Sequence, residues 1–349
     1  MAGSIYDLSV LLPVIQVQKS LPSFWLQYFG SSINFETEDI VWDKVWTDGR
    51  KVAPFVIPAA TGQSTGLEGY ESVTFKPAYV KPKDMVDANR PFERRAGEAL
   101  AVGSLTPEQR FNAAVAETLQ RHNTMIDNRL EWMAAKAIID GAVTISGEKY
   151  PSTTVDFRRH ASLTGQLTGT ARWNQLTGTP LTDLKTMRIA AYNRSGARIR
   201  RVVFGQNAWD YLSARVDLRS MMQMQIDGYG TKVTMMADGY EGYEYMGVIQ
   251  GLNGAGAIEC WVNTAKYIDI DTGAETYIQD QDTVVGVSEM VQGLRAFGAI
   301  RDKGAQFRAL ERFPKMWDEE DPSVTYLMTQ SAPLMIPRQP NATFSLKVV

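Results

Sequence analysis

The most regular hydrophobic pattern in the sequence runs from residue 106 to residue 140. Its apolar side chains recur at spacings of three and four, which places them on one face of a helix. The preceding Thr106-Pro107-Glu108-Gln109 has the order of a capping box with proline at the first helical position, and Gly141 follows as a stop signal. About 34 residues at roughly 1.5 Å each predict a rod on the order of 50 Å long. Because the charges do not keep coiled-coil spacing, the pattern favours a single helix lying across a sheet.

The first hundred residues are rich in aromatic side chains but are broken by proline and glycine. Aromatic residues within 1–50 include Phe24, Trp25, Tyr28, Phe29, Phe35, Trp42 and Trp46. This load is typical of a packed core, yet the stretch is too short and interrupted to enclose the rings unaided. From residue 51 to 95, prolines and glycines interrupt strand-like runs and predict a long two-stranded excursion with a glycine-rich tip. Because an isolated hairpin is marginally stable in water, we expect it to lie either on its own body or on another molecule.

After residue 141 the pattern changes to short strands and short helices. Residues 143–157 are typical of a hairpin or meander, and residues 161–180 of a loop. Two further helices are expected, one from near Thr182 to Gly196 and one through 208–216, with a strand at 199–205 between them. Later strands are predicted at residues 244–251, 256–263, 283–289, 293–300, 326–336 and 342–348. Helix, strand and helix at these short spacings predict an α/β domain.

Composition narrows the classes of function. The chain has 349 residues, 44% of them hydrophobic and 21% charged, which suits about two domains with sizeable cores. The formal net charge of −3 lacks the basic excess of a protein devoted to gripping nucleic acid. The lone Cys260 excludes an internal disulfide and, with only His122 and His160 besides, we expect neither a metal nor a cofactor. No apolar run reaches about eighteen residues and the N-terminus lacks an export pattern, so we expect folding in a cytoplasm without a membrane span.

The sequence contains one motif that is typical of serine hydrolases. Residues 62–66 match G-x-S-x-G, in which a strand delivers the nucleophilic serine to a sharp turn at the start of a helix. Around Ser64 the strand is short and interrupted by proline, and no helix follows. His122 lies on the apolar stripe of the long helix, and His160 follows two arginines that oppose formation of an imidazolium. A glycine-rich hairpin tip accounts for the same five residues without catalysis. A serine hydrolase that uses Ser64 remains the alternative from the enzyme class.

Several blocks of sequence resemble the lambda-type major capsid protein family of tailed bacteriophages. They are FKPAYVKPK at 75–83, VVFGQNAW at 202–209, GLRAFG at 293–298, RFPKMW at 312–317 and QSAPLM at 330–335. The resemblance implies an α+β chain with the HK97-type shell fold. Its parts would be an N-terminal arm at 1–50, an extended E-loop hairpin at 51–95, a P-domain at 96–175 with the spine helix 106–140, an α/β A-domain at 176–300, and a return to the P-domain at 301–349.

The same resemblance implies a structural function. The chain would be a major capsid protein that self-assembles through pentamers and hexamers into the icosahedral head shell around double-stranded phage DNA. Implied partners are a scaffolding protein, a portal protein, a trimeric decoration protein on the outer surface, and DNA bound without sequence specificity on the inner face. Assembly would take place in the cytoplasm of the host bacterium, and the product would be part of the virion.

Contacts between copies are expected to involve the arm and the E-loop. The E-loop would lie over a neighbouring subunit, and the aromatic side chains of the arm would anchor on adjacent copies. Candidate contact residues are Trp25, Phe29, Trp46, Phe75, Pro77, Tyr79, Lys81, Pro82, Arg94 and Arg95. Residues 91–105 and the glycine-rich tip are candidates for the flexing that pentamers and hexamers require. The alternatives are the shell of an encapsulin-like compartment, a serine hydrolase and a nucleic-acid-binding module.

Overall fold

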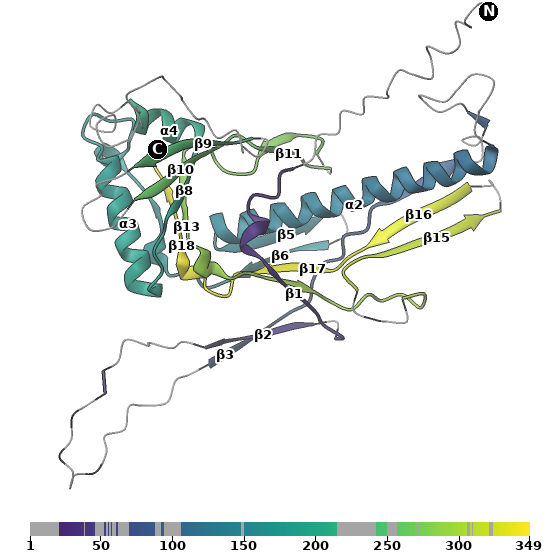
Figure 1. Cartoon of the computed structure of the whole chain (residues 1–349), viewed down its shortest axis with the longest axis horizontal. Coiled ribbons are helices and arrows are strands. Elements are labelled where there is room, and N and C mark those ends of the chain that lie inside the picture. Colours follow the sequence, from purple (N-terminus) through teal and green to yellow (C-terminus); the bar gives the residue numbers. More distant parts are fainter. Residues whose placement is uncertain are drawn as a thin grey trace, which may run out of the picture.

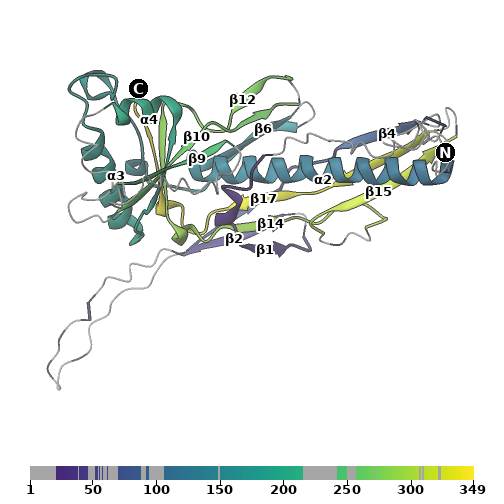
Figure 2. The ribbon, with the colours of Figure 1, turned by 45° about the horizontal axis from the view of Figure 1, so that its top comes forward.

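The chain is described from a computed structural model (Figure 1). The described residues are 21–37, 39–45, 70–87, 106–147, 150–214, 242–249 and 257–349, with short gaps at 271, 306–307, 309 and 321–323. Single positions within 52–61 and the pair 92–93 are also described. An α/β part lies at one end of the molecule, and the long helix α2 runs from it toward the other end (Figures 1 and 2).

Helix α2 confirms the strongest prediction from the sequence. It spans Pro107–Ile139, and both halves of the capping box are present. The Gln109 N–H donates to Thr106 Oγ1 at 3.2 Å, and the Thr106 N–H donates to Gln109 Oε1 at 2.9 Å. Gly141 follows with φ of +70°, a conformation that strains residues with a side chain. The buried face of the helix packs against strands on several sheets, so α2 is the backbone on which the rest is assembled.

The α/β part contains a six-stranded sheet in the order β7-β18-β13-β8-β10-β9. Its strands are β7 Thr164–Gln166, β18 Thr343–Lys347, β13 Thr283–Val287, β8 Arg201–Gly205, β10 Ile258–Asn263 and β9 Tyr243–Ile249. Helices α3 (Pro180–Ser195) and α4 (Gln206–Ser213) pack on β18 and β8 respectively, as the predicted helix, strand and helix require. The last strand β18 pairs with β13 and β7 and so belongs to this sheet, although the sequence placed all of 301–349 with the P-domain.

Smaller sheets line α2. Strands β4 (Lys83–Asp87), β16 (Val324–Gln330) and β15 (Phe313–Glu319) form one antiparallel sheet beside the helix. Strand β1 (Ser31–Asn34) pairs parallel with β14 (Leu294–Phe297), which pairs antiparallel with β17 (Pro333–Ile336). The predicted hairpin after α2 is β5 (Ala142–Gly147) and β6 (Tyr150–Asp156). Strand β15 was not predicted, because its lysine, proline and acidic residues weaken the strand pattern.

Strands β2 (Ile40–Val45) and β3 (Tyr70–Phe75) form the root of the extended hairpin. Ile40 pairs with Phe75 and Val45 pairs with Tyr70, so the paired region begins inside the range 1–50 that was assigned to the arm. In Figure 1 these two strands lie along the lower edge of the body. The glycine-rich tip at 62–69 lies outside the described residues.

The remaining elements are short. Strands β11 (Lys266–Ile268) and β12 (Glu275–Tyr277) form a small hairpin. Single-turn helices are η1 Leu26–Tyr28, η3 Ala161–Leu163, η4 Gly169–Ala171, η5 Glu289–Val291 and η6 Pro340–Ala342. Within the described ranges, no helix combines the length and apolar character that crossing a bilayer requires.

Two buried clusters account for the two parts of the molecule. The larger one surrounds α2 and includes Phe24, Trp25, Ile126 and Phe297. The second fills the α/β part around Phe204 and Phe344.

Candidate assembly surfaces

Residues 21–29, called here the N-terminal segment, cross α2 of their own chain. The backbone N–H groups of Trp25 and Leu26 donate to the two carboxylate oxygens of Glu131, at 2.7 and 2.9 Å. The Leu21 N–H donates to Asn128 Oδ1 at 3.0 Å. These bonds give the backbone of the segment partners on the helix in place of water.

The aromatic side chains of the N-terminal segment are packed against the α/β part. Phe24 stacks on Tyr243, with ring centroids 4.1 Å apart and planes 8° from parallel. Arg201 lies over the Phe24 ring and donates to the Tyr28 hydroxyl at 2.8 Å. Burial raises the pKa of Tyr28 to about 12, although the nearby Arg201 charge opposes that rise. The segment therefore joins α2 to strands β8 and β9, of which β8 contacts Tyr28 from 173 positions further along the chain.

The Phe29 ring packs against the block GLRAFG, and the space that it fills is called here the Phe29 seat. A Cβ added to Gly293 would lie only 2.2 Å from Phe29 Cδ1, so the ring occupies the space that a side chain there would take. The Arg295 Nε–H donates to the Phe29 carbonyl at 2.6 Å, and the Gly293 N–H donates to the Tyr28 carbonyl at 2.7 Å. This block of the sequence holds the N-terminal segment in place.

Trp25 and Phe29 thus depart from the expectation that they anchor on adjacent copies. Both side chains are 0% exposed within a single chain. Their partners could not be inferred from the sequence because Glu131, Tyr243 and Gly293 lie far away along the chain. In this conformation neither ring offers surface to a neighbour.

The block FKPAYVKPK also rests on its own chain. The Tyr79 hydroxyl donates to the Ala299 carbonyl at 2.8 Å and accepts the Arg301 N–H at 3.2 Å. Val80 and Ser331 exchange backbone hydrogen bonds of 2.8 and 3.0 Å, which ties this block to QSAPLM.

The other candidates in the same block differ in exposure. Pro77 is buried, and Phe75 packs partly buried against the larger core. Lys81 is exposed, with Nζ 4.6 Å from the centre of the Tyr79 ring, and Pro82 is half-buried. Lys81 is therefore the candidate of this block whose side chain is most available to another molecule.

The strand that follows, β4, is fastened to α2 by a polar cluster. Asp84 Oδ2 accepts from Arg121 Nη2 at 2.6 Å and lies 2.8 Å from His122 Nε2. The other ring nitrogen of the buried His122 lies 3.2 Å from Thr329 Oγ1 on β16. Partial burial acts to raise the pKa of Asp84, but the hydrogen bonds from Arg121 and His122 outweigh it and lower that pKa. Both nitrogens of His122 are occupied, so it has no free position for general base chemistry.

The opposite face of the sheet β4-β16-β15 carries aromatic and basic side chains. Trp317 and Tyr326 stack across β15 and β16 with centroids 5.5 Å apart. Lys83 Nζ lies 4.0 Å from the centre of the Tyr326 ring, and Met85 beside it is 55% exposed. This face is not covered by α2 and remains half-exposed in the single chain.

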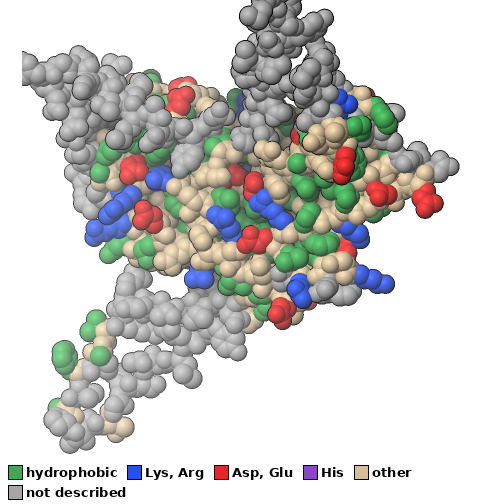
Figure 3. All heavy atoms as spheres, turned by 45° about the vertical axis from the view of Figure 1, so that its right-hand side comes forward, with side chains coloured by type: hydrophobic (Ala, Val, Ile, Leu, Met, Phe, Trp, Pro, Cys, Tyr) green, Lys and Arg blue, Asp and Glu red, His purple; other side chains and the backbone are tan. Residues whose placement is uncertain are grey.

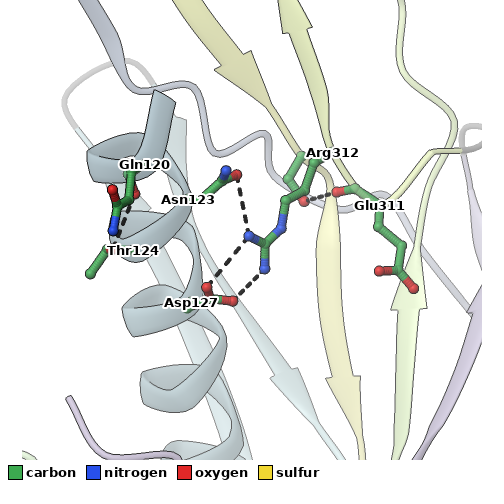
Figure 4. A network of polar contacts seen from close by, with 7 residues as sticks. Gln120, Asn123, Thr124, Asp127, Glu311 and Arg312 are labelled. Atoms are coloured by element: carbon green, nitrogen blue, oxygen red, sulfur yellow. Dashed lines mark hydrogen bonds and ion pairs between the residues drawn. The ribbon is translucent and has the colours of Figure 1, made fainter. Parts of the chain in front are cut away.

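A network of polar contacts at the start of β15 involves the first residues of the block RFPKMW. Arg312 forms a two-pronged ion pair with the Asp127 carboxylate and donates to Asn123 Oδ1 at 3.2 Å, as Figure 4 shows. The Ser331 hydroxyl donates to the Glu311 carbonyl at 2.7 Å nearby. The contacts of Arg312 hold the start of β15 to the middle of α2.

The extended hairpin has a different character. Phe55 is fully exposed, and Val52 and Ile57 are 87% and 71% exposed. Hydrophobic side chains stand on the projecting loop at the lower left of Figure 3. Three large apolar side chains therefore stand exposed to water within a short stretch of this hairpin.

The remaining candidates have other outcomes. Trp46, Arg94, Arg95 and Ser64 lie outside the described residues, as does most of 91–105. His160 caps η3 by accepting the Ser162 N–H at 3.2 Å. Burial raises the pKa of the Cys260 thiol to about 12, which suppresses the reactive thiolate at neutral pH.

Comparison with known proteins adds family membership to this geometry. The model of the family described as phage major capsid protein E matches residues 7–348. The major capsid protein of Escherichia phage N15 is 26% identical over 353 residues, covering 99% of both chains. The major capsid protein of Escherichia phage lambda is 24% identical over 350 residues, again covering 99% of each.

Solved structures share the fold. The crystal structure of a prophage capsid protein from Escherichia coli CFT073 superimposes with a TM-score of 0.69 at 21% identity, covering 94% of both chains. The capsid of cyanophage P-SCSP1u gives a TM-score of 0.52 at 8% identity, covering 97% of this chain and 91% of that one. The predicted α+β, HK97-like shell fold is confirmed.

These findings also decide between the classes of function. The family is structural, so the hydrolase alternative built on Ser64 is not supported. The matched family consists of phage coat proteins, which favours a phage head over an encapsulin-like compartment. The chain belongs to the phage major capsid protein E family, and is a structural coat protein of the HK97-like fold rather than an enzyme.

Proposed function

We propose that this chain forms the icosahedral head shell of a tailed phage through pentamers and hexamers, and that its extended hairpin clasps a neighbouring copy. Coat proteins of this family form multimeric shells that are part of the virion. The hairpin supplies each copy with a reach beyond its own body, which suits contact with a neighbour.

The exposed apolar side chains of the hairpin carry this proposal. Val52, Phe55 and Ile57 are exposed while the core aromatics of the same chain are buried. When another molecule removes apolar surface of this kind from water, the contact gains roughly 25 cal/mol of free energy per Å² buried. Placing the three side chains against a second copy would thus favour closure of the shell.

The roots of the hairpin support a clasp that transmits force. The return leg passes through Tyr79 and Val80, which hydrogen-bond within the chain, and then through Asp84, which binds α2. A loop anchored in this way can pull on the spine helix of its own subunit. We place Lys81 and Pro82 at the edge of the inter-subunit contact, with Trp46, Arg94 and Arg95 as further candidates.

The finer partners follow from the resemblance. We assign to this coat protein a scaffolding protein and a portal protein during assembly in the host cytoplasm, a trimeric decoration protein outside, and packaged double-stranded DNA inside. The near balance of charge, −3 over the chain, supports an inner wall that does not hold DNA tightly.

The test substitutes the most exposed ring of the hairpin. Phe55→Ser removes apolar area from the clasp but leaves the fold intact, so we expect a change of less than about 0.5 kcal/mol in the free energy of unfolding of the subunit. Electron microscopy and sedimentation of the expressed protein should show capsomers or aggregates in place of closed shells. The matched control, Thr61→Ala on the same hairpin, should assemble normally.

Closed shells at wild-type yield from Phe55→Ser would show that this side chain is not part of the clasp. Loss of shells with an equal loss of subunit stability would show an intramolecular role instead.

A further inference from the structure

Glu131 is a carboxylate buried in the contact between α2 and the N-terminal segment. Only 1% of the residue is exposed. Its Oε1 accepts the Trp25 N–H at 2.7 Å and its Oε2 accepts the Leu26 N–H at 2.9 Å. Consecutive backbone donors thus bind one oxygen each, and the segment docks on the helix through Glu131 together with Asn128, which accepts the Leu21 N–H.

Among the residues that the structure describes, no cation is paired with Glu131. The N-terminal segment has no charged side chain to offer. Arg295 on β14 attracts the carboxylate from a distance, but its guanidinium donates to the carbonyls of Phe29 and Leu26, at 2.6 and 3.4 Å.

The titratable neighbour on the opposite side is Tyr243 at the start of β9. This side chain is also fully buried, and burial together with the adjacent Glu131 charge raises the pKa of Tyr243 well above its ordinary value. Tyr243 therefore stays neutral, and a tyrosine side chain is in no protonation state a cation that could pair with the carboxylate. A buried carboxylate that lacks a paired cation is costly to keep ionised.

We propose that Glu131 is a proton-linked latch, in which docking of the N-terminal segment on α2 takes up a proton at this carboxylate and is tighter at mildly acidic than at alkaline pH. When the segment leaves, the carboxylate faces water on the surface of α2 and ionises at no such cost. Docking and protonation are therefore coupled.

The direction of the effect follows from linkage. Burial raises the pKa of Glu131 from 4.5 to about 7, against the opposing effect of the backbone hydrogen bonds from Trp25 and Leu26. A carboxyl whose pKa is raised on docking stabilises the docked state fully at low pH and loses that contribution as the pH rises through the raised value. The docking constant should fall roughly tenfold between pH 6 and pH 8.

The latch has a consequence for assembly that rests on the proposed function. The N-terminal segment leads directly into β1 and then into the strands β2 and β3 of the hairpin. Release of the segment would remove the attachment of this stretch to α2. The pH would therefore influence how strongly the position of the hairpin is fixed relative to its own subunit. The docking step itself does not require a shell.

Hydrogen exchange of the unassembled full-length subunit tests the latch. Mass spectrometry of peptides covering residues 21–29, at pH 6 to 8 and corrected for the intrinsic exchange rate, should show protection falling roughly tenfold. Glu131→Gln should flatten this pH dependence, because the amide does not titrate. Glu117→Gln, at an exposed position on the same helix, should keep the wild-type profile.

Two results would overturn the latch. One is constant corrected protection of residues 21–29 in the wild-type subunit across this pH range, which needs no substitution and holds whether or not the glutamine variant folds. The other is a wild-type pH dependence in Glu131→Gln. Neither depends on shell formation, so failure of the clasp and failure of the latch are separable.

Discussion

The N-terminal segment and the extended hairpin are both apolar, yet the chain treats them in opposite ways. Phe24, Trp25 and Phe29 are fully buried against residues of their own chain, whereas Val52 and Ile57 of the hairpin face water. The N-terminal segment is buried because its own chain supplies hydrogen-bond partners for its backbone and space for its rings. The Glu131 carboxylate accepts the backbone N–H groups of the segment, and Gly293 leaves space for the Phe29 ring, so the segment is part of the core.

The comparison shows that aromatic content alone does not identify an interface. A ring belongs to the core when the chain supplies a complementary seat, and it is available to a partner when no such seat exists. We therefore expect assembly of this coat protein to depend more on the hairpin than on the buried rings of the N-terminal segment.

The largest expected effect comes from removing the central ring of the segment. Trp25→Ala would leave a cavity between α2 and Tyr243, so we expect a loss of about 3–5 kcal/mol in the free energy of unfolding. Chemical denaturation of the subunit measures it. A loss under about 1 kcal/mol, with shells abolished, would return Trp25 to the interface and break the comparison.

A smaller effect is expected where the Phe29 seat is filled. Gly293→Ala places a Cβ 2.2 Å from the Phe29 ring, so the ring must shift and the free energy of unfolding should fall by about 1–3 kcal/mol. Gly30→Ala is the matched control, because nothing lies within 4 Å of a Cβ there. Equal melting temperatures for the two variants would mean that Phe29 does not occupy a fitted seat.

A third test concerns the anchor of the hairpin. Asp84→Asn weakens the bonds to Arg121 and His122, and we expect about 1 kcal/mol of destabilisation at neutral pH, since Asp84 is partly exposed. The folded pKa of Asp84 is lowered, so its contribution is present above the unfolded value near 3.8 and is lost as the pH falls through the lower folded value.

The measurement is the free energy of unfolding of wild type and Asp84→Asn from pH 7 downward. The two curves should converge as Asp84 becomes protonated. A gap that stays constant down to the lowest pH at which the subunit folds would contradict the assigned role of the carboxylate charge.

The smallest effect on stability is expected in the hairpin itself. Phe55→Ser should leave the free energy of unfolding nearly unchanged while it removes closed shells, which is the reverse of the pattern expected for Trp25→Ala. The two variants together divide residues that stabilise the subunit from residues that join subunits.

Elements with local causes could be predicted from the sequence alone. The capping box placed the start of α2 at Thr106 and Pro107, and Gly196 marked the end of α3, because caps and periodicity depend on residues within one or two turns. The hairpin β5–β6 and the strands of the α/β sheet followed from similar short-range patterns, with the exception of β7, which lies within the predicted loop 161–180. The sequence blocks that resemble the capsid protein family identified the fold, but they did not show which residues these blocks contact.

Contacts between distant residues were decided by the tertiary structure. Trp25 and Glu131 are separated by 106 positions, and His122 and Thr329 by 207, so no spacing rule links them. Sheet membership was decided in the same way, since β18 joins β13 and β7 although it lies at the end of the chain. The sequence by itself determined the long helix, the two shorter helices, most strands of the α/β sheet and the family, because these depend on local pattern. Which aromatic side chains are buried and which are left for other copies depends on packing between elements far apart in the chain, and only the folded structure decides it.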